Sequence, residues 1–186
     1  MYGIVNNALK DLVLTAAGPE AWIAITQAAG YEGISIEDTK NYDDDVTLKI
    51  VATACEHLGM ELEDVLYSFG RHWVLFTENK GWAKHFMLPA DSFLGVLEGL
   101  DELHTRVKDA MPDGDMPFFN LSKDGHDYTL EYHSSREGLA PMVLGIIDGL
   151  AERFGEKWQC EQVRRRQEWG FDTFALKLVK DGVGDA

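Results

Sequence analysis

The sequence predicts an α+β fold, in which a helical N-terminal part precedes a four-stranded antiparallel sheet that carries one long helix. Through the first two thirds of the 186 residues, apolar side chains recur every three or four positions, as along one face of a helix. After Pro117, apolar and polar residues alternate in short runs bounded by turn residues, which is typical of strands. Helices that precede the strands, instead of alternating with them, favour α+β over α/β.

The first predicted helices are bounded by residues that commonly start or stop a helix. Pro19 stands near the first position of the second helix, where a proline is tolerated, and Gly30 ends that helix. Three aspartates at residues 43–45 favour the start of the third helix, because they lie at the positive end of its dipole. Gly59 ends it. The predicted helices cover about residues 1–16, 19–29, 46–58, 62–73 and 93–107.

Two features concern the last two of these helices. Gly70 interrupts the apolar stripe of residues 62–73 and makes a bend possible there. Asp91 or Ser92 can cap the following helix, and the Pro-Asp-Gly-Asp-Met-Pro segment at residues 112–117 ends it.

The C-terminal part alternates as strands around a single helix. Residues 118–121 and 126–134 form a predicted hairpin with a Lys-Asp-Gly turn between them. A helix follows at about residues 139–154, with Pro141 tolerated in its first turn. Residues 157–164 and 172–179 are the last two predicted strands, joined by a polar connection.

We expect a single domain over residues 1–180, with a helical subdomain at about residues 1–60, a second part at about 61–180, and a flexible tail at 181–186. The helical and sheet parts are expected to share one ligand site at their interface, where pockets tend to form.

The composition excludes some classes of partner. The formal charge is −15, which disfavours binding to nucleic acid or to anionic membranes and favours a partner with a basic face. Only two cysteines, Cys55 and Cys160, are present, too few for a disulfide framework or a cysteine-rich zinc site. No apolar run approaches the length of a membrane span, so we expect a soluble, cytoplasmic protein.

His104 is the first candidate site residue. It is the one histidine of six that lies within a strong apolar helical stripe, together with Leu100, Leu103 and Val107. It can be a core histidine whose ring nitrogens bond to the backbone or to water. It can also be an axial iron ligand, because a neutral imidazole in a dry pocket coordinates iron well.

Tyr132, Ser134 and Arg136 form the second candidate group. Alternate residues of a strand share one face, so a phenol, a hydroxyl and a guanidinium converge there and can bind carboxylates. An exposed strand face with a surface ion pair is the simpler interpretation of this pattern. Considered with His104, however, the group points to one ligand. A ligand that has a metal with an axial position and two carboxylates on its edge is a haem.

Together these residues resemble the haem nitric oxide/oxygen-binding (H-NOX) family, and in particular a stand-alone bacterial-type member related to the haem domain of soluble guanylate cyclase. The similarity covers nearly the whole chain. The segments that carry it are residues 1–6, Phe69-Gly70, Trp73, Leu103-His104, Pro117, Tyr132-x-Ser134-x-Arg136 and residues 138–145.

The resemblance implies haem b as cofactor, buried between the helical and sheet parts, with His104 as the axial ligand of its iron. It implies that Tyr132, Ser134 and Arg136 clamp the haem propionates. Ile4 and Pro117 match positions that press on the porphyrin and distort it. Asp44 matches, more loosely, a position that pairs with the clamp arginine.

The resemblance also bears on which gas binds. Family members that hold oxygen stably have a distal tyrosine, whereas the matching segment here contains none and places Met142, within one residue, at that position. Bound oxygen needs a hydrogen-bond donor more than nitric oxide does. We therefore expect binding of nitric oxide and carbon monoxide with little stable oxygen binding. Trp73 can oppose this by donating its indole N–H to the ligand, or it can be a core residue.

The expected function is a gas sensor, not an enzyme, whose ligand-induced release of His104 is detected by a separate histidine kinase or diguanylate cyclase. One alternative is a haem peroxidase or nitric oxide dioxygenase, which requires a distal acid or base, and His72 is the nearby candidate. His72 is expected to point elsewhere, because its neighbour Trp73 lies on the inward stripe. Another alternative is a haem-free module that binds a small carboxylate.

Overall fold

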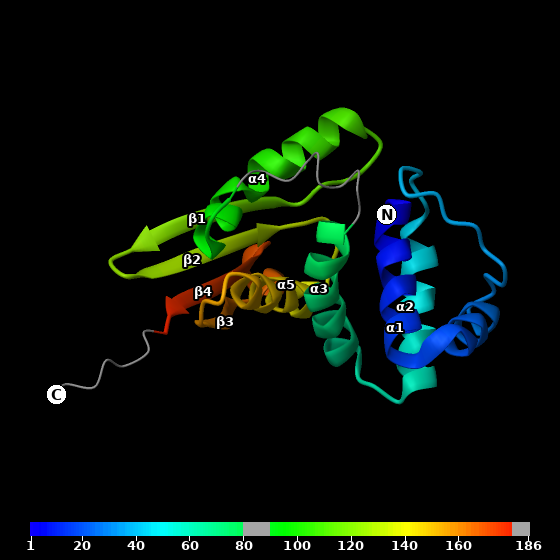
Figure 1. Cartoon of the computed structure of the whole chain (residues 1–186). Coiled ribbons are helices and arrows are strands. Elements are labelled where there is room, and N and C mark those ends of the chain that lie inside the picture. Colours follow the sequence, from blue (N-terminus) through cyan, green and yellow to red (C-terminus); the bar gives the residue numbers. More distant parts are fainter. Residues whose placement is uncertain (80–89, 180–186) are drawn as a thin grey trace.

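The computed structural model describes residues 1–79 and 90–179, and over these residues it confirms the α+β prediction (Figure 1). The tail predicted at residues 181–186 lies outside the described residues. The helices are α1 (Gly3–Ala28), α2 (Asp44–Leu58), α3 (Leu62–Asn79), α4 (Phe93–Ala110), α5 (Ala140–Arg153) and α6 (Arg166–Trp169); the strands are β1 (Phe118–Asp124), β2 (Asp127–His133), β3 (Trp158–Arg164) and β4 (Asp172–Leu178).

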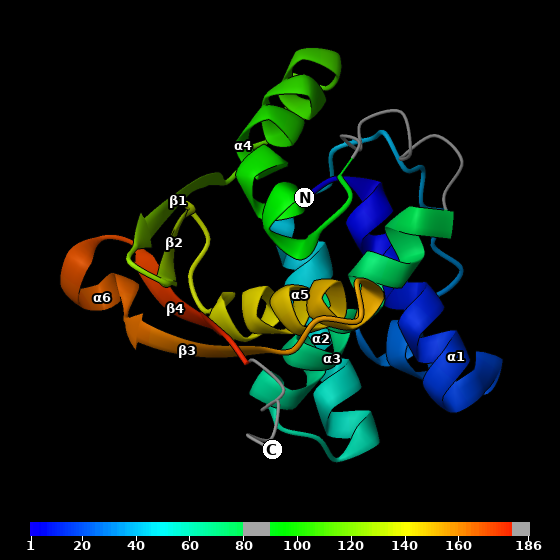
Figure 2. The ribbon, with the colours of Figure 1, turned by 60° about the vertical axis from the view of Figure 1, so that its left-hand side comes forward.

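The four strands form one antiparallel sheet in the order β1-β2-β4-β3. In the β1–β2 hairpin, Phe119 faces Tyr132 and Leu121 faces Leu130. Helices α4 and α5 cover one face of this sheet, with α4 lying over β1, while α1 and α2 form a separate layer on the far side of α3 (Figures 1 and 2).

Local sequence signals explain where the helices begin. The Asp43 side chain accepts a hydrogen bond of 3.0 Å from the Asp45 amide, so α2 begins at Asp44. The Ser92 hydroxyl accepts one of 3.1 Å from the Gly95 amide and caps α4. The break predicted before Pro19 is a kink inside α1, where Gly18 has φ of +84°, a conformation that favours glycine.

The sequence left a bend possible at Gly70, and the structure shows another use for this glycine. Helix α3 runs without interruption from Leu62 to Asn79, and the glycine is needed for close contact with α5. A Cβ atom at Gly70 would overlap the Met142 carbonyl oxygen, and one at Gly145 would overlap the Tyr67 carbonyl oxygen. The two backbones therefore touch, and only glycine fits at either position.

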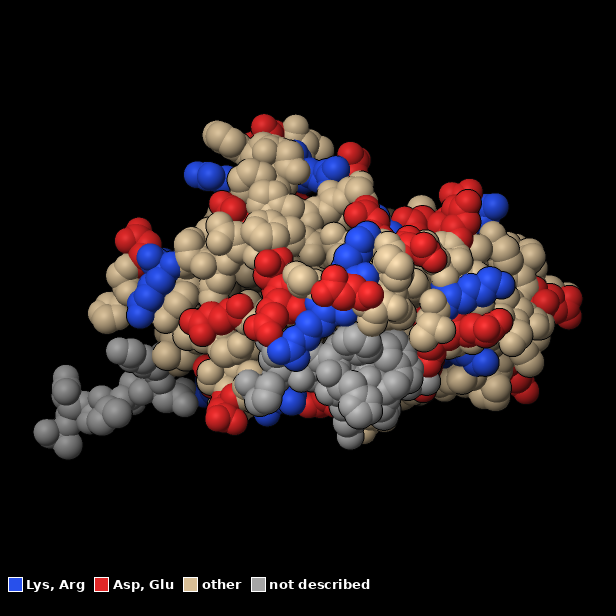
Figure 3. Space-filling view, turned by 90° about the horizontal axis from the view of Figure 1, so that it is seen from above, with Lys and Arg blue, Asp and Glu red and all other residues tan. Residues whose placement is uncertain are grey.

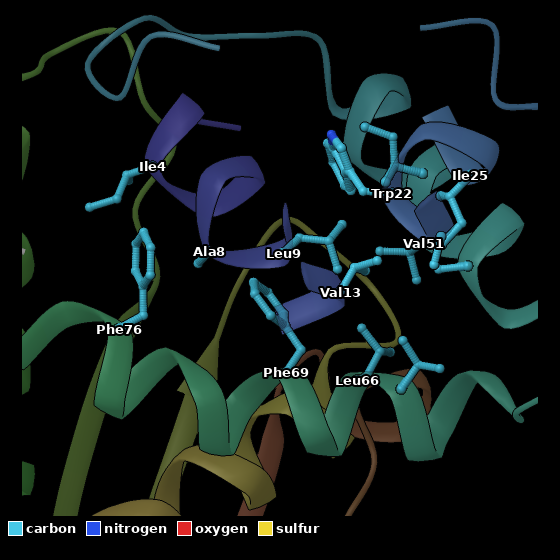
Figure 4. Close-up of a cluster of buried hydrophobic side chains, with 14 of the residues drawn as sticks. Ile4, Ala8, Leu9, Val13, Trp22, Ile25, Val51, Leu66, Phe69 and Phe76 are labelled. Atoms are coloured by element: carbon cyan, nitrogen blue, oxygen red, sulfur yellow. The ribbon is translucent and has the colours of Figure 1, made fainter. Parts of the chain in front are cut away.

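Two hydrophobic cores lie on opposite sides of α3. The first core joins α1, α2 and α3, and Figure 4 shows Phe69 and Leu66 of α3 pointing toward Leu9 and Val13 of α1. The second core joins the covered face of the sheet to α5 and to the N-terminal half of α4. Its most buried members are Phe93, Leu130, Ile147, Phe174 and Leu176.

The acidic composition is visible on the surface. In the view of Figure 3, Asp and Glu side chains are spread across the face of the molecule, with Lys and Arg side chains between them. Among residues 1–79 and 90–179, no helix is long and apolar enough to cross a membrane.

Candidate ligand-binding site

A cavity of about 290 Å³ lies between α4 and the pair formed by α3 and α5. Protein interiors rarely contain voids larger than a water molecule, and this volume is near the lower end of ligand and cofactor pockets, about 300–1,000 Å³. Most of its walls are apolar. The eight residues expected to bind or border the haem all line it, namely Ile4, Trp73, His104, Pro117, Tyr132, Ser134, Arg136 and Met142.

His104 lies on the cavity-facing side of α4 with one ring nitrogen already bonded. Its Nδ1 is 2.7 Å from the Leu100 carbonyl oxygen, which can only accept, so Nδ1 carries the hydrogen. Burial lowers the pKa of His104, which favours the neutral ring. The phenyl ring of Phe119 packs beside the imidazole, with centroids 5.3 Å apart. The Nε2 atom therefore has a lone pair, and an imidazole in this neutral form can coordinate a metal.

Helix α4 changes character along its length. Phe93, Val96 and Leu97 in its N-terminal half are buried in the second core. In its C-terminal half, Leu100, Leu103 and Val107 continue the apolar stripe beside His104, but they line the cavity and are only half-buried. A half-buried apolar face that borders a cavity is suited to a flat apolar ligand.

The predicted carboxylate-binding group lies at one end of this cavity. Tyr132 is 5% exposed, and burial raises the pKa of its phenol, which therefore stays protonated as a donor. The Ser134 hydroxyl accepts a hydrogen bond of 3.1 Å from the Arg136 amide and so shapes the turn after β2. Together with the Arg136 guanidinium, these groups place three polar side chains beside apolar walls.

Arg136 is held in place by an acidic partner on α2. Its Nε donates to Asp44 Oδ2 at 2.7 Å and its Nη2 to Asp44 Oδ1 at 3.3 Å, while Nη1 donates to the Asp115 carbonyl at 2.9 Å. Burial acts to raise the pKa of Asp44, but hydrogen bonds from Arg136 and from the ammonium of Met1 lower it overall. Each terminal nitrogen of Arg136 keeps a second hydrogen for another acceptor, such as a propionate.

The wall opposite His104 comes from the start of α1 and from α3 and α5. Ile4 and Met142 line it. Trp73 lines it while its indole contacts Phe69 edge-on and stacks with Phe76. The two interpretations of Trp73 are thus compatible, since one residue both packs in the first core and borders the cavity. Pro117 lines the cavity just before β1.

His72 lies outside the residues that line the cavity. Its Nε2 is 2.8 Å from Asp11 Oδ2, and the pair links α3 to α1. A distal acid or base must reach the bound ligand, and His72 is directed elsewhere, as its position beside Trp73 predicted.

Sequence reasoning missed several residues that shape the site. Asp115 was considered only as part of a helix-ending segment, yet its carbonyl accepts from Arg136 and its carboxylate accepts from Ser135. The Tyr2 hydroxyl donates to the Met111 carbonyl and ties the chain start to the end of α4. Arg153 also lines the cavity, although it was assigned only to the end of a helix. None of the three has a local sequence signal, because each acts on a segment distant in the chain.

The residues present fit a haem. The described residues contain no group of three or more His, Cys, Asp or Glu side chains that could hold a metal ion. A porphyrin supplies the remaining iron ligands itself. His104 would hold the iron, the half-buried face of α4 would cover one side of the ring, and Tyr132, Ser134 and Arg136 would bind its carboxylates.

The chain matches a family model and several curated proteins. The family model described as haem-NO-binding matches residues 2–162. Among curated proteins, soluble guanylate cyclases gcy-35 and gcy-37 of Caenorhabditis elegans are 27% identical over 184 residues and 28% identical over 151 residues, which are 96% and 79% of this chain. The match covers 27% and 21% of those proteins, so the chain spans about a quarter of their length.

Solved structures share the fold at lower sequence identity. An H-NOX protein from S. oneidensis in the Fe(II)NO ligation state is 21% identical with a TM-score of 0.86, and the match covers 97% of this chain and all of that one. An oxygen-binding H-NOX domain in its oxygen complex is 20% identical with a TM-score of 0.82, over all of this chain and 98% of that one. The same fold is thus found in a nitric oxide complex and in an oxygen complex.

Proposed function

The chain belongs to the haem-NO-binding family, and from that premise we propose that it is a haem-based sensor of nitric oxide that regulates a separate effector protein. The observation that carries the proposal is the cavity itself, where a neutral imidazole, an apolar wall and a carboxylate-binding group border one space. When bound, haem b supplies a ferrous iron that binds nitric oxide or carbon monoxide. We further propose that residues 1–180 act as one domain around it.

The proposed roles follow from the position of each side chain. His104 donates the lone pair of Nε2, while its bond to the Leu100 carbonyl fixes the ring. Tyr132, Ser134 and Arg136 bind the propionates, and Asp44 orients the guanidinium of Arg136. Ile4 and Pro117 are proposed to press on the ring from their places in the cavity wall.

We propose that the cavity binds oxygen weakly because donors on the wall opposite His104 are scarce or already engaged. Except for Arg153 at its last position, the α5 residues that line the cavity are apolar: Met142, Val143, Ile146, Ile147 and Leu150. The Thr77 hydroxyl on α3 donates within its own helix, to the Trp73 carbonyl at 2.9 Å or the Val74 carbonyl at 3.1 Å. The Tyr2 hydroxyl donates to Met111. Oxygen on iron gains most from a donor, so its complex is the one most weakened.

Signalling is proposed to depend on α4. Release of His104 from iron would free the C-terminal half of α4, which packs mainly on β1. The end of that helix is joined to the chain start through Tyr2 and to the Arg136 loop through Asp115, so its movement would reach both parts of the molecule. The resemblance favours a histidine kinase or a diguanylate cyclase as the protein that responds.

Absorption spectroscopy tests the proposal directly. Purified ferrous protein should show a Soret band that shifts with nitric oxide and with carbon monoxide but not in air. His104→Ala should change the ferrous spectrum even if haem is retained by the clamp and the apolar walls. His72→Ala is the matched control, since His72 lies outside the cavity, and should leave the spectrum unchanged. A colourless protein after expression with ample haem would instead favour the small-carboxylate module.

Gas selectivity is tested at Met142 and Trp73. Met142→Tyr should create a stable oxygen complex in air, because it adds a hydroxyl donor to an apolar wall. Trp73→Phe removes the indole N–H and keeps the aromatic packing. If Trp73→Phe weakens an oxygen complex that the unmodified protein already forms, the proposed selectivity is wrong.

A further inference from the structure

The cavity has a second cationic residue, far from the clamp. Arg153 ends α5, whose 14 residues rise about 20 Å at 1.5 Å per residue, whereas Arg136 belongs to the loop before that helix. The cavity therefore extends along α5 from the carboxylate-binding end to a second end at Arg153.

Arg153 closes this second end with a partner from α3. Its Nε lies 2.5 Å from Glu78 Oε1, and the two side chains are 31% and 32% exposed. The same guanidinium lies 5.1 Å from the centre of the Phe154 ring. Arg153 therefore both lines the cavity and meets solvent, which places its ion pair with Glu78 at the boundary between the two.

The surroundings of this pair suit a small uncharged ligand. Val74 and Leu150 lie about one turn before Glu78 and Arg153 in their helices, line the cavity and offer no charge, and the hydroxyl of Thr77 is bonded within α3. At the other end, the acidic edge of a bound porphyrin would occupy the space beside Arg136. The end at Arg153 is therefore the one that leads to the wall opposite His104 without passing the clamp.

We propose that the Glu78–Arg153 ion pair is a gate through which small neutral ligands enter and leave the cavity. This inference rests on the proposed function, since it concerns access to the same site. A partly exposed ion pair is weak, so it opens often. A gate changes the rates of entry and exit by the same factor and leaves the affinity unchanged.

The test measures carbon monoxide association and dissociation after flash photolysis of the haem-loaded protein. In Arg153→Ala and in Glu78→Gln, both rate constants should rise together by about two- to fivefold, the factor that one partly exposed pair can supply, with the equilibrium constant unchanged. High salt should raise both rate constants of the unmodified protein and not those of the variants, because salt screens the ion pair. The double variant Glu78→Arg with Arg153→Glu should restore slow exchange.

The chain offers a matched control. Arg71 and Glu152 form another ion pair between α3 and α5, and neither lines the cavity. Arg71→Ala should leave both rate constants unchanged. Equal acceleration in Arg71→Ala, or a changed affinity in Arg153→Ala, would overturn the gate, because the effect would then come from helix packing or from ligand contact.

Xenon exchange followed by NMR provides a readout without iron chemistry. Xenon should enter the cavity faster in Arg153→Ala than in Arg71→Ala. A protein that takes up no haem would contradict the proposed function while xenon exchange still tests the gate. Haem-loaded variants with unchanged carbon monoxide and xenon rates would overturn the gate and leave the proposed function intact.

Discussion

The two walls of the cavity are built differently. The wall formed by α3 and α5 is locked, because their backbones touch at Gly70 and Gly145 and because Tyr67 bonds to Asp148 across the same contact. The opposite wall is the C-terminal half of α4, which packs mainly on β1 and leaves its apolar face on the cavity.

The difference shows how one fold can combine rigidity with response. A wall with interlocked backbones has few alternative arrangements, so it keeps the distal space constant. A helix held along one edge can move at low cost, because few buried contacts are lost. His104 lies on the wall that can move, where a change at iron can be converted into a change of shape.

The largest expected effect comes from a substitution in the backbone contact between α3 and α5. Gly145→Ala places a Cβ on the Tyr67 carbonyl oxygen, and we expect the free energy of unfolding to fall by more than about 3 kcal/mol, the upper end for overpacking. Gly95→Ala on α4 is the control, since its Cβ meets only side chains. This substitution should change the free energy of unfolding by about 1 kcal/mol or less. Urea denaturation measures both, and similar losses at the two sites would contradict the comparison.

A second pair of substitutions compares the two halves of α4. Leu97 is 3% exposed, so Leu97→Ala should cost about 2–3 kcal/mol by leaving a void in the second core. Leu103 is half-buried beside the cavity, and Leu103→Ala in haem-free protein should cost about 1 kcal/mol or less. Thermal unfolding of the haem-free protein distinguishes them, because Leu97→Ala should lower the melting temperature more than Leu103→Ala.

The reactivity of Cys160 indicates how firmly α5 packs on the sheet. It lies on β3 beneath α5, and burial raises the pKa of its thiol to about 12, so almost no thiolate is present at neutral pH. Alkylation by iodoacetamide should be slow in the native protein and faster in Gly145→Ala, while Leu103→Ala should leave the rate unchanged. Rapid alkylation of the native protein, located by mass spectrometry, would show that α5 leaves the sheet readily.

The smallest expected effect concerns the link between α2 and the clamp. The pKa of Asp44 is lower folded than unfolded, so this carboxylate contributes stability above its unfolded value of 3.8 and loses it as the pH falls through the folded value. Because Asp44 is 38% exposed, solvent screening limits the contribution to about 1 kcal/mol or less. Asp44→Asn should flatten the loss of stability below about pH 4, and an unchanged acid limb in urea titrations would contradict this.

Much of the architecture could be predicted because it depends on local pattern. Helical and strand periods placed the major elements, and Asp43, Ser92 and Gly59 marked boundaries. The four-residue α6 was missed, because one turn within a polar connection has no periodicity. The close approach of α5 at Gly70 was not predicted, because a glycine that avoids a clash looks the same in sequence as one that permits a bend.

The sequence by itself determined the order of helices and strands, the apolar stripe around His104 and the alternate spacing of Tyr132, Ser134 and Arg136. Only the tertiary structure decided that these groups border one cavity, that Asp44 and Asp115 hold the guanidinium, and that Glu78 meets Arg153. Periodicity is a property of neighbouring residues, whereas a cavity exists only where distant segments pack without filling the space between them.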